Sequence, residues 1–274
     1  MPASTLFPGE RVFEEKDLHE LIGNGQYVEV NGEKRLLSRL PPPKGHDSSA
    51  YSIPFGASGI QLIDKSNLDA AIDDQVARLA RVSDYIDFDP FDQDGLPTCW
   101  AIGTAQLVSI TRRILGLPHK QMSGCSLAVP ISGGHVGGYE GDSIKYAYDH
   151  GVCDTDVWPE NQTRGISNSD PKVIASREKH RARAFIQVQN DQQWWSALLR
   201  TVAGVFAYNW MSHVMAMCDF VRIEAGRYGY RSRNSWGKWG SANRLGFMGF
   251  NVYPMGHGTP SSGFVLQDIL PSET

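Results

Sequence analysis

The segment 98–115 constrains the fold of this chain more than any other part of the sequence. Its residues are apolar on nearly every helical face until Arg112 and Arg113, and the pattern ends at Gly116 and Pro118. A helix that is hydrophobic all round belongs in the centre of a protein, and the two arginines stand where the helix dipole favours cations. A chain of 274 residues is long enough to enclose such a helix. The sequence therefore predicts a large core around one central helix.

The second half of the chain has a different pattern. A further helix is predicted over 142–150, and after residue 183 short runs of β-branched and aromatic residues predict strands. These strands are expected at 184–189, 204–208, 213–217, 228–233 and 245–250. Because the predicted helices precede the strands, we expect an α+β fold over residues 81–274, with a helical lobe followed by a β-barrel-like lobe.

Residues 1–80 are predicted to form an N-terminal extension. The run 27–37 alternates apolar and polar residues around an Asn-Gly step, which predicts a β-hairpin. The prolines of 41–45 predict a stiff linker, and apolar residues at helical spacing over 63–79 predict one amphipathic helix.

Composition excludes several classes of partner. Lys and Arg (26) nearly balance Asp and Glu (30) without a long charge run, so no nucleic-acid partner is expected. No apolar stretch could span a bilayer and the N-terminus lacks signal-peptide features, so we expect no membrane partner and a cytoplasmic chain at synthesis. The cysteines are few, widely spaced and in no C-x-x-C arrangement, so neither a disulfide framework nor a metal site is expected. No cofactor is implied.

Two residues have the character of a nucleophile and its base. Cys99 opens the predicted central helix, where free N–H groups and the positive end of the dipole stabilise a thiolate. Among the eight histidines, only His213 lies in an apolar, strand-like context that could hold an imidazole rigidly. Taken alone, a cysteine or histidine of this kind is more often structural. Their neighbours decide the interpretation.

Four motifs in order resemble those of the papain-like cysteine peptidase family. Residues 93–101 read QDGLPTCWA, with a glutamine six positions before the cysteine, and 233–240 read RNSWGKWG, close to the family's Asn-Ser-Trp-Gly signature but one spacer residue short. Between them, 137–139 read GGY, and His213 follows in the expected order. The resemblance covers roughly residues 81–250 and implies the papain-like two-lobe fold.

The resemblance implies a role for each site residue. Cys99 would attack the peptide carbonyl as a thiolate, and His213 would protonate the leaving amine. Asn234 would orient the imidazole, with Trp236 shielding that hydrogen bond. The Gln93 side-chain amide and the backbone N–H of Cys99 would bind the oxyanion.

Further residues are expected to bind the substrate or support the site. Gly137 and Gly138 lack a Cβ and would let an extended protein or peptide substrate pair with their backbone, with Tyr139 beside them. For these glycines a plain turn is nearly as good an interpretation. Val214 stands where the family has a small residue and would narrow a neighbouring pocket. Trp100 would support the site from within the nucleophile motif.

The chain departs from the family in three places. Leu96 and His135 stand where secreted members carry a pair of disulfide-bonded cysteines, which fits a protein folded in a reducing compartment. The long excursion that usually precedes the catalytic histidine is missing, so the cleft should be more open. The family's helical inhibitory propeptide is not recognisable in residues 1–80, which could be an inhibitor of another design or a docking module.

The leading hypothesis is a cysteine endopeptidase. Short proteins of this design also resemble proteins associated with tailed bacteriophages, so a second hypothesis is a virion or assembly component. It would dock through residues 1–80 and use the papain-like fold as a scaffold. A third, an amidase or transglutaminase, fits less well because such enzymes normally lack the Asn-Ser-Trp-Gly motif.

Overall fold

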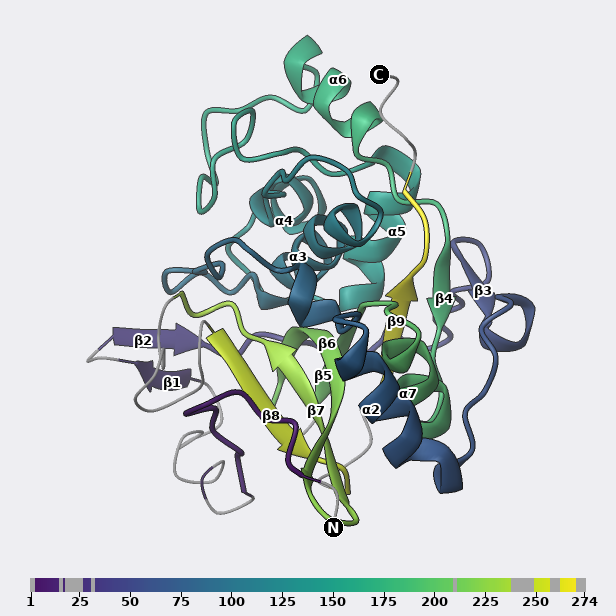
Figure 1. Ribbon diagram of the computed structural model, residues 1–274. Coiled ribbons are helices and arrows are strands. Elements are labelled where there is room, and N and C mark those ends of the chain that lie inside the picture. Colours follow the sequence, from purple (N-terminus) through teal and green to yellow (C-terminus); the bar gives the residue numbers. More distant parts are fainter. Residues whose placement is uncertain are drawn as a thin grey trace.

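A computed structural model describes residues 3–14, 17, 27–30, 33–208, 211–237, 249–256 and 262–269. The helices are α2 (Leu68–Ala77), α3 (Cys99–Ile114), α4 (Cys125–Ser132), α5 (Glu140–His150), α6 (Pro171–Lys179) and α7 (Asp191–Leu199). The strands are β1 (Tyr27–Val30), β2 (Glu33–Leu36), β3 (Ser52–Pro54), β4 (Phe185–Gln187), β5 (Gly204–Tyr208), β6 (His213–Glu224), β7 (Arg227–Arg233), β8 (Phe250–Pro254) and β9 (Ser262–Leu266). Figure 1 shows α3 to α6 gathered in one lobe and β5 to β8 in the other.

The β lobe contains a seven-stranded sheet in the order β3-β4-β9-β5-β6-β7-β8. Its central strands pair antiparallel, and the pairing of β5 with β6 places Tyr208 opposite His213. Strand β3, from the first 80 residues, joins one edge by pairing parallel with β4. The short hairpin of β1 and β2 forms a separate two-stranded sheet.

The sheet has two apolar faces because its side chains alternate. Val205 and Val214 belong to the hydrophobic cluster that surrounds α3, whereas Phe206 and Met215 belong to the cluster that includes α7. A Cβ atom at Gly103 of α3 would lie 2.8 Å from a methyl of Val214 and 2.9 Å from one of Val205. The glycine thus allows α3 to lie directly on the start of β6, and this contact brings the two lobes together at the site described below.

Most of the predicted elements are confirmed. The central helix is α3, and its first 14 residues are all buried. The predicted helices at 63–79 and 142–150 correspond to α2 and α5, and the antiparallel pairing of β1 with β2 confirms the hairpin strands. The Asn-Gly turn and most of the predicted strand at 245–250 lie outside the described residues. Helices α4, α6 and α7 were not predicted from the sequence.

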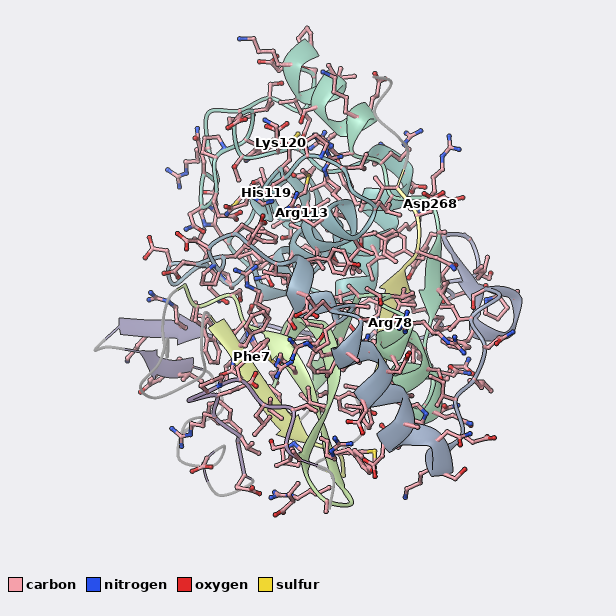
Figure 2. The ribbon with its side chains drawn as sticks, in the orientation of Figure 1. Phe7, Arg78, Arg113, His119, Lys120 and Asp268 are labelled. Atoms are coloured by element: carbon pink, nitrogen blue, oxygen red, sulfur yellow. The ribbon has the colours of Figure 1, made fainter. Side chains whose placement is uncertain are left out.

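The first described residues lie along the β lobe. The backbone N–H of Thr5 donates to Arg222 O, and that of Phe13 donates to Val252 O, each at 2.9 Å. Phe7 lies beside β7 and β8 (Figure 2), 6.0 Å from Phe250 between ring centroids. These contacts show that the first described residues pack against the β lobe. The division of the chain at residue 80 stays a prediction.

Candidate active site

Cys99 is the first residue of α3 and is fully buried. The first residues of a helix carry N–H groups without partners inside the helix, and the helix dipole is positive there. Two arginines lie at the opposite end, in the last turn. The thiol therefore stands where a negative charge is stabilised.

His213 begins β6, and its ring contacts two residues of the segment after β7. Its Nε2 lies 2.8 Å from Asn234 Oδ1, which also accepts a hydrogen bond from the backbone N–H of Ser235 at 2.7 Å. An atom that accepts from a backbone N–H is an oxygen, so His213 Nε2 must carry the proton and donate it to Asn234. The Trp236 ring stacks on the imidazole at 4.7 Å between centroids and covers this hydrogen bond. In the neutral ring, Nδ1 is then the unprotonated nitrogen, which can accept the proton of a thiol.

The surroundings of Cys99 act on its pKa in opposite directions. Burial raises the pKa of the thiol, because a buried thiolate loses its hydration. The charge of His213 and the nearby imidazole lower the pKa, as do the Ser38 hydroxyl, 3.3 Å from Sγ, and the backbone N–H of Val214. The lowering contributions are larger together, and the pKa of Cys99 lies below the usual range of a thiol. The other cysteines differ, since burial raises the pKa of Cys125 to about 12 and that of Cys153 to about 11.

Gln93 is tied to the same segment as Asn234. Its backbone N–H donates to Ser235 O at 2.9 Å, and its side-chain oxygen accepts from Ser235 Oγ at 2.7 Å. Nε2 donates to Leu96 O at 2.8 Å and to Leu36 O at 3.0 Å. Because carbonyl oxygens only accept, these two bonds fix which end of the amide is nitrogen. Gln93 Nε2, which was predicted to bind the oxyanion, thus donates to the carbonyl of Leu36, a residue of the first 80.

Gly137 and Gly138 lie where a side chain would not fit. A Cβ atom on Gly138 would lie 2.4 Å from the Trp100 ring, and one on Gly137 would lie 2.2 Å from Ser38 O. Trp100 is fully buried and donates from its indole to Pro97 O at 3.1 Å. The structure therefore brings these glycines and Trp100 together beside Cys99, in contact with another extended stretch of backbone.

Tyr139 and Val214 flank this region. Tyr139 precedes α5, and its ring makes an edge contact with His46 at 4.8 Å between centroids. The Val214 side chain packs against Gly103 of α3, while its backbone N–H lowers the pKa of the Cys99 thiol. A contribution of either side chain to substrate binding stays a prediction.

Residues 36–40, which we call the strap, run across the site, and the sequence did not predict this. Ser38 Oγ lies 3.3 Å from Cys99 Sγ. The N–H of Gly138 donates to Ser38 O at 3.1 Å, and the N–H of Leu40 donates to Gly138 O at 2.9 Å. Arg39 pairs with Gly138 in a parallel bridge and donates from its backbone to Ser212 O. A strand-like segment of the chain itself thus covers Cys99.

All four cysteines are free, and among the described residues no group of three His, Cys, Asp or Glu side chains could hold a metal ion. None of the described helices is long and apolar enough to cross a membrane.

Solved structures with a similar fold are cysteine proteases. Xylellain, a cysteine protease from Xylella fastidiosa, aligns at a TM-score of 0.60 and 16% identity over 84% of this chain and 95% of its own. Procathepsin B S9 from Trypanosoma congolense aligns at 0.56 and 13% identity over 93% and 99%. Digestive procathepsin L 3 from the larval midgut of Tenebrio molitor aligns at 0.54 and 12% identity over 92% and 78%.

No model of a protein family matches the chain, and no curated protein matches it either. At such identities the likeness concerns the fold, and it agrees with the order of the four sequence motifs. The chain has the α+β fold of the papain-like cysteine proteases.

Proposed function

We propose that the chain is a cysteine peptidase that hydrolyses peptide bonds with Cys99, His213 and Asn234. The observation that carries the proposal is the buried series from thiol to imidazole to amide, in which Asn234 fixes the proton on Nε2 and the thiol has a lowered pKa. A structural cysteine needs none of these partners. A nucleophilic cysteine needs all of them.

The mechanism follows from these positions. The Cys99 thiolate attacks the peptide carbonyl carbon, and the oxyanion forms between the backbone N–H of Cys99 and Gln93 Nε2. The His213 imidazolium then donates its Nδ1 proton to the leaving amine as the C–N bond breaks, leaving an acyl-enzyme. Neutral His213 next takes a proton from water, which attacks the thioester and releases the acid. Asn234 keeps the ring in one orientation throughout.

The alternatives are less well supported. The comparisons give proteases as structural neighbours and add nothing to the association with bacteriophage particles. An amidase or transglutaminase would use the same Cys99 and His213, so it is separated from a peptidase by its acyl acceptor and substrate. Protein and peptide substrates agree with the identity of the similar structures as proteases.

The pH dependence of alkylation tests the proposal. Iodoacetamide should modify Cys99 at least about tenfold faster in the wild-type protein than in His213→Gln at pH 6, because the charge of His213 lowers the pKa of the thiol and so raises the thiolate fraction of the wild type. The difference should persist through the ordinary pKa of a thiol, near 8.5, and shrink only at higher pH, because without His213 the burial of Cys99 raises its pKa above that value.

Mass spectrometry of the peptide containing Cys99 gives the rates. The strap covers Cys99 in both proteins, so its opening slows both reactions and the ratio isolates the effect of His213. Cys125 provides an internal control, because burial raises its pKa and its labelling should not depend on His213. Equal rates for Cys99 at pH 6 would contradict the proposal.

A further inference from the structure

The Arg39 side chain reaches from the strap to a carboxylate that has no access to solvent. Arg39 Nε donates to Glu140 Oε2 at 3.1 Å, and Nη2 donates to Oε1 at 3.3 Å. The side chains are 2% and 0% exposed, although the residues are 101 positions apart in the chain. This two-bond geometry is specific for a guanidinium and a carboxylate. A carboxylate buried so completely requires a cation at this place.

Glu140 lies beside the backbone that pairs with the strap. Gly138, two residues before it, donates to Ser38 O and accepts from the Leu40 N–H. Any extended chain that pairs with Gly138 in place of the strap would put one of its side chains where Arg39 lies now. The Tyr139 ring, 5.9 Å from the Arg39 guanidinium carbon, adds an aromatic wall that favours a cation.

We propose that Glu140 supplies the charge of a subsite that selects an arginine or lysine side chain in the substrate, and that Arg39 fills this subsite while the enzyme is latent. The proposal rests on the peptidase function proposed above. An apolar side chain would not replace the two charge-assisted hydrogen bonds that Arg39 donates to the carboxylate, and a lysine would restore the charge but not the paired hydrogen bonds.

The strap is held in a way that resists cleavage. The group that lies against Cys99 Sγ is the hydroxyl of Ser38, not a peptide carbonyl. The Ser38 carbonyl accepts from Gly138, and the carbonyl that Gln93 contacts belongs to Leu36. The nucleophile and the oxyanion donor therefore contact different residues of the strap. A second buried arginine, Arg35, pairs with Asp92 at 3.2 Å and anchors the strap at its other end.

A binding measurement tests the subsite. The full chain carrying Cys99→Ser and Arg39→Gln cannot acylate and has lost its internal arginine. Fluorescence anisotropy gives its Kd for labelled alanine-based hexapeptides in which one arginine moves through the six positions, each matched by a peptide with citrulline, the neutral isostere. At one position the arginine peptide should bind about tenfold more tightly or better.

Adding Glu140→Gln to this protein should bring the matched Kd values to within about twofold of each other. Equal Kd values with Glu140 present, a preference that survives Glu140→Gln, or no binding of any peptide would overturn the proposal. Circular dichroism melting of each variant confirms that it is folded. Because no reaction is needed, this test can fail while the His213-dependent alkylation of Cys99 succeeds, and the converse also holds.

The rate of Cys99 alkylation tests whether Arg39 keeps the enzyme latent. With Cys99 present, Arg39→Gln should raise the rate of Cys99 alkylation about tenfold or more, because the strap loses the ion pair that holds it over the thiol. Lys44→Gln removes a cation from an exposed residue nearby and should leave the rate unchanged. An unchanged rate in Arg39→Gln would show that Arg39 does not hold the strap closed.

Discussion

Replacing His213 with alanine should lower kcat/KM for peptide hydrolysis by about 10⁴-fold or more. The variant loses the group that protonates the leaving amine. It also loses the largest contribution that lowers the pKa of Cys99, so burial raises that pKa and the thiol stays protonated. The initial rate on fluorescently labelled casein measures the effect. The full chain carrying Arg39→Gln is the suitable background, since its strap is weakened.

Three variants show whether the loss is specific. Cys99→Ser should be at least as inactive as His213→Ala. Asn234→Ala should lose less, because it removes the group that orients the imidazole and leaves the imidazole itself. His135→Ala removes an exposed histidine and should retain full activity. Activity that survives in both Cys99→Ser and His213→Ala would remove the basis for a Cys-His peptidase.

Replacing Arg231 with methionine should reduce the free energy of unfolding by about 3–5 kcal/mol. Its guanidinium lies between two carboxylates, 2.5 Å from Glu10 Oε1 and 2.7 Å from Asp219 Oδ2, and all three side chains are 0% exposed. The Phe7 ring lies 3.9 Å from the guanidinium carbon. Without Arg231, two like charges would remain buried side by side, which is more costly than the loss of the pair itself.

Urea unfolding followed by tryptophan fluorescence measures this change. Arg227→Met is the matched control on the same strand, because Arg227 is 38% exposed and pairs with the partly exposed Glu14, so its loss should cost at most about 1 kcal/mol. Adding Glu10→Gln and Asp219→Asn to Arg231→Met should recover much of the stability. Similar losses for Arg231→Met and Arg227→Met would contradict the prediction. Since Glu10 belongs to the first described segment, the result would also show how far that segment stabilises the β lobe.

The sequence predicted the elements whose signals are local. Helix α3 was predicted because a helix buried on all sides is apolar on all sides. The residues of the site were predicted because short motifs keep their spacing along the chain, as in residues 93–101 and 233–237. Helix α7 was missed, although Asn190 caps it by accepting from the Gln193 N–H at 3.0 Å, because its apolar residues follow one another without a clear helical period.

By itself, the sequence determined the fold class and the central helix, and it predicted the nucleophile, its base and the amide that orients it, since each depends on residue type and short spacing. Only the tertiary structure decided that the strap lies over Cys99 and that Arg39 meets Glu140. Both residues are charged and would ordinarily be assigned to the surface. Their burial results from the packing of α5 against α3 and from the route of the chain after β2. No local pattern encodes a contact between residues 101 positions apart.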